Sequence, residues 1–233
     1  MTKILAIETC SESCSVALLY KGEQQQKIST EPRGHADAVL PMVDELLQQA
    51  AISLKNLDVI AFTRGPGAFT GVRIGTSVAQ GLALASDLPL IAVSSLAVLA
   101  QGSYRETSIK HCLAALDARM SEVYFGVYQL NKAGLMLSAE EDQVAKPDNV
   151  LLKEEKKLLS SSKSWQTAGA GWVNYNDALQ ERFRLWNLLE QKHFPYPQAQ
   201  DLITQAKWYY QNDQLIDPAQ AIPVYVRDKV VRS

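Results

Sequence analysis

The residues with the clearest chemical meaning form the glycine-rich run GPGAFTGVRIG at positions 65–75. Glycines this close together let the backbone pass where side chains would not fit. The short apolar segment 57–63 precedes the run and predicts a buried strand, so the glycines are expected at a strand-to-helix turn. Such a turn can bind phosphate, because free backbone N–H groups and a helix N-terminus can face an anion. The first hypothesis for the run is therefore a phosphate-binding loop.

The spacing within this run argues against a phosphate-binding loop. A Walker loop ends in Gly-Lys-Ser/Thr, whereas Gly71 is followed by Val72 and Arg73, and the third glycine comes one residue late for a dinucleotide fingerprint. The alternative is structural, because small residues recur every four positions and form one stripe along the predicted helix, which favours close packing against another helix. The members of this stripe are Gly67, Gly71, Gly75, Ala79 and Ala83.

The histidines and cysteines give no support to metal chemistry or nucleophilic catalysis. They are His35, His111, His193, Cys10, Cys14 and Cys112. No two histidines have the spacing of three or four residues that a metal site on one helix face needs. The cysteines contain no CxxC pair, which favours a reducing compartment over a disulfide framework. No Gly-x-Ser-x-Gly elbow is present.

The charge balance predicts a chain that does not bind nucleic acid by itself. The 233 residues include 23 Lys and Arg against 25 Asp and Glu, for a formal net charge of −2. An autonomous nucleic-acid-binding protein usually carries a basic stripe, so any contact with RNA is expected to require a partner. The chain begins without a signal-peptide pattern, and no apolar run approaches about 20 residues. We therefore expect a cytoplasmic protein without a membrane segment.

The pattern of apolar residues predicts an α/β fold made of two similar units. The first unit opens with a three-stranded meander, and the second opens with a hairpin formed by strands at 112–118 and 122–130. Two units that each open with a hairpin suggest an internal duplication. We place the units at 1–103 and 104–233, and the last helix and the tail could return to the first unit. The other elements expected are strands at 4–9, 15–20, 24–30, 57–63 and 90–93 and helices at 36–50, 70–85, 94–101 and 201–211.

Five motifs together resemble the TsaB (YeaZ) family. The resemblance covers most of the chain and is strongest over residues 1–130. The glycine run at 65–75 is its most specific motif. The motifs are IxxIETCS at 4–11 followed by VAL at 16–18, His35 with LP at 40–41 and DELL at 44–47, GPGAFTGVRIG at 65–75, VSSL at 93–96, and LDAR at 116–119 followed by EVY at 122–124.

The resemblance implies both a fold and a function. The fold would consist of two actin-like (ASKHA, ribonuclease H-like) subdomains, each a mixed sheet that opens with a β-hairpin and is flanked by helices. The function would be that of a non-catalytic subunit, not an enzyme by itself and without a cofactor or metal. In that family the subunit binds the catalytic paralogue TsaD, and the ATPase TsaE joins them, for threonylcarbamoyl transfer to adenosine 37 of tRNA. Transfer RNA would be bound only through the complex.

The resemblance also places a partner interface on the helices at 36–50 and 70–85. The same surface could support a homodimer when the partner is absent, because paralogous subunits share its shape. From the apolar pattern alone, these faces could equally be ordinary core. Arg73 and Arg119 could contact nucleotide or RNA at a composite site. The expected interface residues are Val39, Val43, Leu46, Leu47, Gly71, Gly75, Ala79 and Ala83.

Two other classes of function remain open. A kinase or nucleotide hydrolase of the ASKHA type needs glycines that expose backbone donors and carboxylates that hold Mg²⁺. The first hairpin carries Glu8 but no glycine in its turn, and in the second hairpin Asp117 is followed by Ala118 and Arg119, whose side chains crowd a phosphate. Glu8 and Asp117 could still hold a metal, so an enzyme with a degraded site is one alternative. A peptidase is the other.

Overall fold

The first half of the chain forms a five-stranded mixed sheet. The computed structural model describes residues 1–31, 34–159, 163–189 and 195–226, so His193 lies outside the described residues. The strand order is β3-β2-β1-β4-β5, with β1 antiparallel to β2 and parallel to β4. The central strands β1 and β4 are buried along their whole length, as is typical of parallel strands covered on both faces. The strands are β1 (Ile4–Glu8), β2 (Cys14–Tyr20), β3 (Glu23–Ser29), β4 (Val59–Thr63) and β5 (Leu90–Val93).

The second sheet repeats the topology of the first. Its order is β11-β10-β6-β7-β8, in which β6 is antiparallel to β7 and parallel to β10. Thus β6, β7, β8, β10 and β11 correspond one by one to β1 to β5, and the additional short strand β9 pairs with β7. This repeat is the structural form of the duplication expected from the two hairpins. The strands are β6 (His111–Arg119), β7 (Glu122–Leu130), β8 (Met136–Ser138), β9 (Gln143–Ala145), β10 (Ser164–Ala168) and β11 (Asn187–Leu189).

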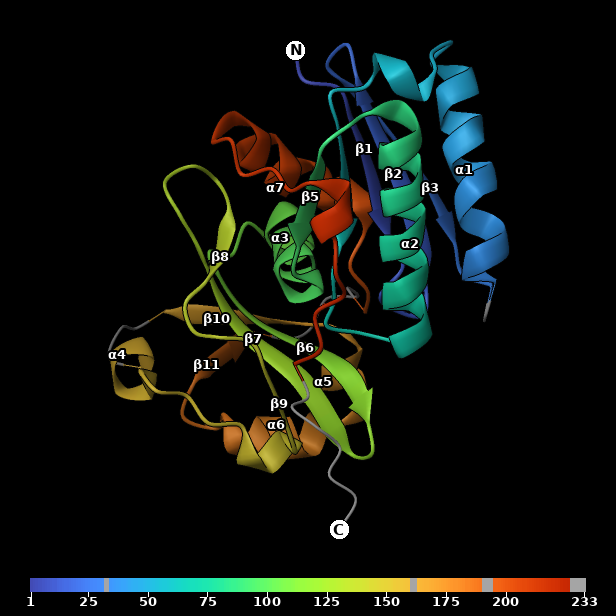
Figure 1. The fold of residues 1–233 in the computed structure, drawn as a ribbon. Coiled ribbons are helices and arrows are strands. Elements are labelled where there is room, and N and C mark those ends of the chain that lie inside the picture. Colours follow the sequence, from blue (N-terminus) through green and yellow to red (C-terminus); the bar gives the residue numbers. More distant parts are fainter. Residues whose placement is uncertain (32–33, 160–162, 190–194, 227–233) are drawn as a thin grey trace.

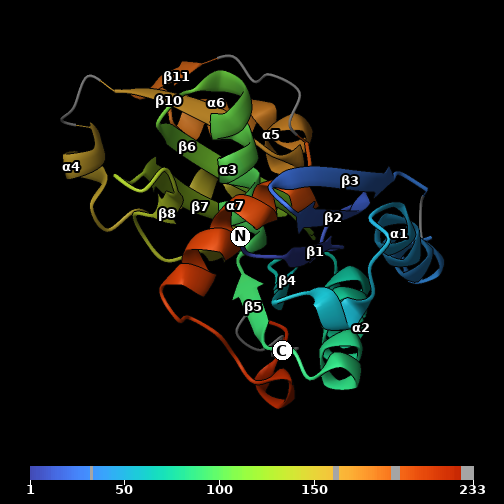
Figure 2. The same ribbon diagram turned by 90° about the horizontal axis from the view of Figure 1, so that it is seen from above.

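The helices and sheets alternate in layers (Figures 1 and 2). Helices α1 (His35–Gln49) and α2 (Phe69–Ser86) cover the outer face of the first sheet. Between the sheets lie α3 (Ser95–Thr107) and α7 (Ala199–Gln211), whose apolar side chains share one core with both sheets. The far face of the second sheet is covered by three short helices. These are α4 (Glu155–Leu159), α5 (Ala170–Asn174) and α6 (Asn176–Arg182), and 3₁₀ turns occur at Leu54–Asn56, Pro147–Asn149 and Pro218–Gln220.

Helix α7 belongs to the second half of the sequence but contacts every strand of the first sheet. Two hydrogen bonds fix its start there, because Ala199 N donates to Ser15 Oγ (2.9 Å) and Gln200 N donates to Gln26 Oε1 (2.7 Å). The two halves are therefore held together by a shared helical layer. The boundary near residue 103 stays a prediction.

Helix α3 is longer than the sequence pattern predicts. The expected end near residue 101 is wrong, because α3 continues to Thr107. Gly102 suggests a helix end, but it lies inside the helix, where a Cβ atom would be 2.7 Å from the Asp201 Oδ2 atom. The missing side chain lets the carboxylate of α7 approach α3, and Arg105 Nε then donates to Asp201 Oδ1 at 2.7 Å.

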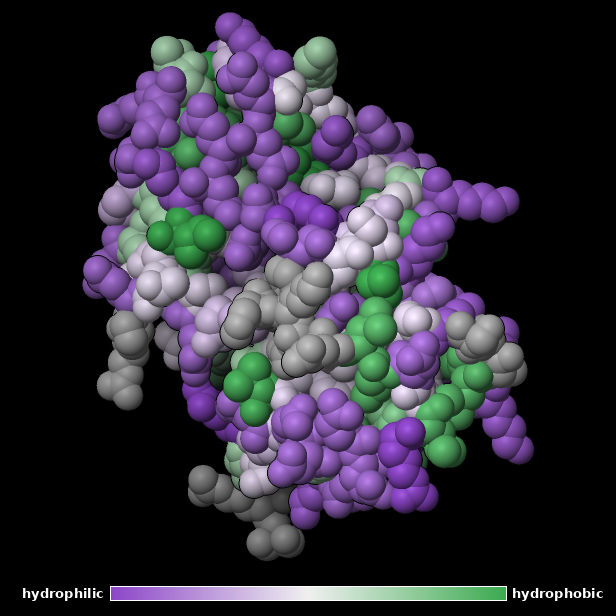
Figure 3. Space-filling model, turned by 180° about the vertical axis from the view of Figure 1, so that it is seen from behind, coloured by the Kyte–Doolittle hydropathy of each residue, from purple (hydrophilic) through white to green (hydrophobic). Residues whose placement is uncertain are grey.

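The surface gives little sign of a large apolar patch on the face seen from behind, where small groups of hydrophobic residues lie among hydrophilic ones (Figure 3). Among the described residues, no helix combines the length and the apolar composition needed to span a membrane.

Candidate functional site

The glycine run packs against the loop that follows β1. A Cβ atom on Gly67 would lie 2.1 Å from the carbonyl oxygen of Cys10, and one on Gly71 would lie 2.0 Å from that of Thr9. On Gly75 it would lie 2.3 Å from Thr9 Oγ1. The stripe was expected to face another helix, and this interpretation is wrong for its three glycines, because they meet a loop of the chain's own first hairpin. The glycines are needed for this close approach of two backbone segments.

Two hydrogen bonds tie the same loop to the start of α2. Ala68 N donates to Cys10 O at 2.7 Å, and the Thr9 hydroxyl donates to Gly71 O at 2.7 Å. The side of the turn that faces β1 is therefore filled by protein. The glycine run accordingly positions α2 relative to the first hairpin.

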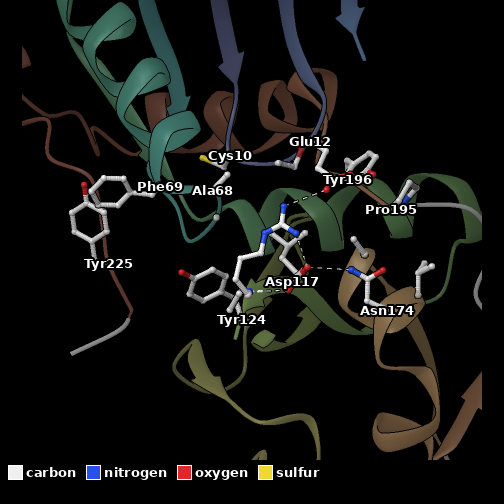
Figure 4. Close-up of a pocket in the computed structure, with 17 residues that line it drawn as sticks. Cys10, Glu12, Ala68, Phe69, Asp117, Tyr124, Asn174, Pro195, Tyr196 and Tyr225 are labelled. Atoms are coloured by element: carbon white, nitrogen blue, oxygen red, sulfur yellow. Dashed lines mark hydrogen bonds and ion pairs between the residues drawn. The ribbon is translucent and has the colours of Figure 1, made fainter. Parts of the chain in front are cut away.

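A cavity of about 630 Å³ lies where the turns of the two halves meet (Figure 4). Its volume falls within the range of small-molecule sites. Aromatic and small apolar side chains make up most of its wall, and three charged residues project toward it. The lining residues are Cys10, Ser11, Glu12, Gly67, Ala68, Phe69, Leu116, Asp117, Ala118, Arg119, Tyr124, Ala170, Val173, Asn174, Pro195, Tyr196 and Tyr225.

The Arg119 guanidinium lies between two carboxylates of the cavity wall. Its Nη1 atom is 3.4 Å from Asp117 Oδ2, and its Nη2 atom is 3.5 Å from Glu12 Oε1 on the other half of the chain. Glu12 Oε2 also accepts a hydrogen bond from the Tyr196 hydroxyl at 2.8 Å. The Glu12 carboxylate therefore receives two donors from the second half and links the two sides of the cavity.

Asp117 is held by groups of its own half. Its Oδ1 atom accepts from Arg119 N (2.8 Å) and from the Tyr175 hydroxyl (3.2 Å), and its Oδ2 atom accepts from Asn174 Nδ2 (3.2 Å). The turn that carries Arg119 is unusual, because Arg119, Met120 and Ser121 have φ angles of 61°, 55° and 59°. Consecutive left-handed residues other than glycine are costly, and such backbone often occurs at functional sites.

Glu8 lies inside the protein rather than in the cavity wall. Its side chain has an exposed fraction of 0%, and Oε1 accepts a hydrogen bond from Cys10 N at 2.7 Å. Burial raises the pKa of the Glu8 carboxyl from its usual 4.5 to about 8 and outweighs that hydrogen bond, which lowers the pKa. The carboxyl is therefore protonated at neutral pH and carries no charge that could attract a cation.

The Cys10 thiol is equally unsuited to act as a nucleophile. It is buried, lies 3.1 Å from Thr63 Oγ1, and burial raises its pKa to about 12. The reactive form of cysteine is the thiolate, which this environment disfavours. Within the described ranges, no three His, Cys, Asp or Glu side chains gather into a metal site.

The eight expected interface residues lie inside the chain. Val39, Val43, Leu46 and Leu47 pack in the core between α1 and the first sheet, and the four small residues of α2 are buried as well. Their apolar pattern thus describes the chain's own core, so a partner would meet other residues of these helices. The outer faces of α1 and α2 expose Leu40 (46% exposed), Gly81 and Leu84 (63% exposed). Contact of these helices with a partner stays a prediction.

The two arginines singled out in the sequence have different surroundings. Arg119 lines the cavity, whereas Arg73 stacks on the Phe69 ring, with Cζ 3.6 Å from the ring centroid, and donates from Nε to the Tyr225 hydroxyl at 2.8 Å. Tyr196 and Tyr225 were missed by sequence reasoning. Their partners lie 184 and 152 positions away, respectively, so no local pattern could have indicated these contacts.

The duplicated strand order and the cavity between the two halves define the class of this protein as a two-subdomain actin-like α/β fold. A family model described as "TsaD: tRNA N6-adenosine threonylcarbamoyltransferase" matches residues 26–232. The chain is 38% identical to the tRNA threonylcarbamoyladenosine biosynthesis protein TsaB of Escherichia coli (strain K12) over 228 residues, which cover 98% of this chain and 96% of that protein. It is 34% identical to the protein of the same name from Haemophilus influenzae, over 97% of this chain and 94% of that one.

Two solved structures agree with these relatives. YeaZ from Pseudomonas aeruginosa superposes with a TM-score of 0.83 at 40% identity, covering 97% of this chain and all of that one. A second structure, titled as an uncharacterized protein with similarity to peptidase YEAZ from Pseudomonas aeruginosa, gives 0.88 at 42% identity over the same shares. The chain belongs to the TsaB (YeaZ) family of tRNA threonylcarbamoyladenosine biosynthesis proteins. The resemblance identified from the sequence motifs is confirmed.

Proposed function

We propose that this chain is a non-catalytic subunit of the machinery that makes threonylcarbamoyladenosine in tRNA. It binds the catalytic paralogue TsaD, and the ATPase TsaE joins this pair. In the cytoplasm, the complex transfers the threonylcarbamoyl group to adenosine 37 of tRNA. Transfer RNA is bound only through the complex, because the chain has a net charge of −2 and no basic stripe in its sequence.

The state of the acidic groups near the cavity is the observation that carries this proposal. A nucleotide site of this fold needs a free carboxylate for Mg²⁺ and backbone donors for phosphate. Here Glu8 is buried and neutral, while Asp117 and Glu12 already accept hydrogen bonds or ion pairs from the chain's own side chains. The glycines that could expose backbone donors are packed against the first hairpin. This arrangement supports a role in assembly rather than in catalysis.

The outer faces of α1 and α2 are the proposed contact surface for TsaD. They expose Leu40 and Leu84, and Gly81 offers a place where another backbone can approach. The same surface would let the chain form a homodimer when TsaD is absent.

Replacement of Gly81 tests this interface without disturbing the fold. A Cβ atom on Gly81 meets nothing within 4 Å in the part of the chain that the structure describes, so Gly81→Leu adds bulk to the outside of α2. We expect the variant to stay folded by circular dichroism, to lose the complex with TsaD on size exclusion, and to fail in a reconstituted threonylcarbamoyladenosine reaction. Gly81→Ala is the matched control, because it changes the helix but adds only one methyl group. If Gly81→Leu still pairs with TsaD and supports full activity, the interface does not include this part of α2. If the reaction reaches full activity without this chain, the proposed assembly role is wrong.

The cavity itself favours a second candidate, a nucleotide-binding kinase or hydrolase of the ASKHA type. It has the size of a ligand site and lies between the two halves. Calorimetry with Mg²⁺-ATP separates the two candidates. The assembly proposal expects weak or absent binding by the isolated chain, whereas a Kd at or below the micromolar range, worth about 8 kcal/mol, would favour the enzyme. Binding that appears only after TsaD is added would indicate a composite site.

A further inference from the structure

The last described residues of the chain lie against the glycine turn. Val224 N donates to Arg64 O at 2.8 Å, and Val224 O lies so close to Gly65 that a Cβ atom there would be 2.7 Å away. Gly65 has a φ angle of 103°, in the region that favours glycine. The turn therefore presents the Arg64 carbonyl oxygen as an acceptor, and the side-chain-free backbone of Gly65, to an extended segment of the chain.

The side chains at the start of α2 hold the same segment. The Arg73 Nε atom donates to the Tyr225 hydroxyl at 2.8 Å, and the guanidinium lies 3.6 Å from the ring centroid of Phe69 and 5.8 Å from that of Tyr225. The two rings lie next to each other at the edge of the cavity, with centroids 5.8 Å apart (Figure 4). Arg73 is thus bound by two aromatic rings and a phenol oxygen, a combination that stabilises an arginine side chain.

The segment is held firmly upstream and weakly at its end. Ala221 is buried in the core, and the Ile216 backbone exchanges two hydrogen bonds with Leu90 on the edge of the first sheet. By contrast, residues Phe69 and Tyr225 are 58% and 48% exposed, so solvent reaches the contacts that hold residues 223–226. The end of the segment can therefore leave the turn while Ala221 stays in place.

From these contacts we infer that residues 64–73 form a groove for an extended peptide that carries a tyrosine, and that residues 223–226 occupy this groove as an internal ligand. Arg64 O binds the peptide backbone, Arg73 binds the phenol oxygen, and Phe69 contacts the aromatic ring. A protein partner with an extended, tyrosine-bearing segment exchanges with the internal one. This groove lies at the cavity edge and its occupation is independent of the proposed function.

The internal ligand sets the conditions for exchange. A segment tethered by a short linker has an effective concentration in the millimolar range, so a free peptide competes poorly with it. Weakening the internal contact should therefore raise the affinity for a peptide added in solution.

Hydrogen exchange tests whether Arg73 holds the segment. In the full-length chain we expect Arg73→Ala to accelerate exchange of the Val224 amide at least tenfold, and Tyr225→Phe, which keeps the ring but removes the hydroxyl, to accelerate it several-fold. Arg184→Ala is the matched control, because that arginine forms an exposed ion pair with Glu181 of α6, a helix that packs on the second sheet. If the Val224 amide exchanges at the same rate in the wild type and in all three variants, Arg73 does not hold residues 223–226 on the turn.

Peptide binding tests whether the groove accepts a second segment. The probe is a fluorescently labelled peptide Ala-Ile-Pro-Val-Tyr-Val, measured by anisotropy against the full-length wild type and against Tyr225→Ala. We expect the variant to bind it at least tenfold more tightly than the wild type, and to bind a peptide with Ala in place of Tyr at least tenfold more weakly. Equal affinity for both chains, equal affinity for both peptides, or absence of binding up to millimolar concentration would overturn the inference.

Discussion

Replacement of Glu8 by Gln should remove a large pH dependence from the stability of this protein. Glu8 is fully buried, and its pKa in the folded chain is about 8, whereas a solvated glutamate in the unfolded chain has a pKa near 4.5. Between these pH values the folded state keeps a proton that the unfolded state releases. The free energy of unfolding therefore falls as pH rises from about 4.5 to about 8, and levels off above that.

The magnitude follows from the two pKa values. One pKa unit is worth about 1.4 kcal/mol, so the wild type should lose about 5 kcal/mol of unfolding free energy across this interval because of Glu8. Glutamine cannot ionise, and its Oε1 atom can still accept the hydrogen bond from Cys10 N. Any cost of placing the amide group is the same at every pH.

Urea unfolding followed by tryptophan fluorescence at pH 5, 6, 7, 8 and 9 measures the effect. The difference between wild type and Glu8→Gln is the useful quantity, because the titration of other groups such as Asp142 and His111 cancels in it. We expect this difference to change by about 4 kcal/mol in favour of the variant between pH 5 and pH 9, because part of the full effect of Glu8 falls below pH 5. Glu181→Gln makes the same chemical change at an exposed position and is the matched control for the substitution itself. A difference between wild type and Glu8→Gln that stays constant with pH would refute the argument that Glu8 is buried as a neutral acid.

Three further predictions concern other parts of the chain. Gly71→Ala should lower the free energy of unfolding, measured by urea unfolding, by at least about 1–3 kcal/mol, because its Cβ would meet the Thr9 carbonyl oxygen. Gly81→Ala should raise it by about 0.5–1 kcal/mol, because no described atom lies within 4 Å of that Cβ. Glu155→Gln should lower the free energy of unfolding at pH 7 by about 1.5–3 kcal/mol in urea unfolding, because it breaks the paired hydrogen bonds from Arg182. The contact with Arg182 lowers the pKa of Glu155, so the difference between wild type and variant should shrink as pH falls through that lowered pKa. The isolated chain should bind tRNA more weakly than about 1 µM at physiological salt, and filter binding should show the affinity falling further as salt is added.

The elements of the first sheet could be predicted from sequence because each carries its own local signal. Strands β1 and β4 are short apolar runs, and α1 has a regular apolar stripe, so their ends were predicted to within two residues. The strands β8 to β11 have three to five residues each, which is too few to carry a clear apolar pattern. They form because neighbouring strands offer edges for pairing: β8 and β9 pair with β7, β10 pairs with β6, and β11 pairs with β10.

The site was harder to predict than the fold because its contacts join distant parts of the chain. The bond between Arg73 and Tyr225 spans 152 positions, and that between Glu12 and Tyr196 spans 184. Residue type was also misleading at Glu8, since a carboxylate at the end of a strand is usually solvated, yet this one is fully buried. Whether such a group is charged depends on its surroundings, which only the folded structure supplies.

An apolar helix face does not by itself distinguish core from interface, and α2 shows why. Its stripe of small residues meets the first hairpin so closely that Gly71 tolerates no Cβ, while on the opposite side Gly81 has open space around it. Both are glycines within one helix, and each costs helix stability relative to alanine. At Gly71 that cost is offset by the packing of the chain on itself, but among the described residues no side-chain or backbone atom lies within 4 Å of a Cβ at Gly81. The glycine that the chain's own packing does not require is therefore the one whose replacement most directly tests for a partner.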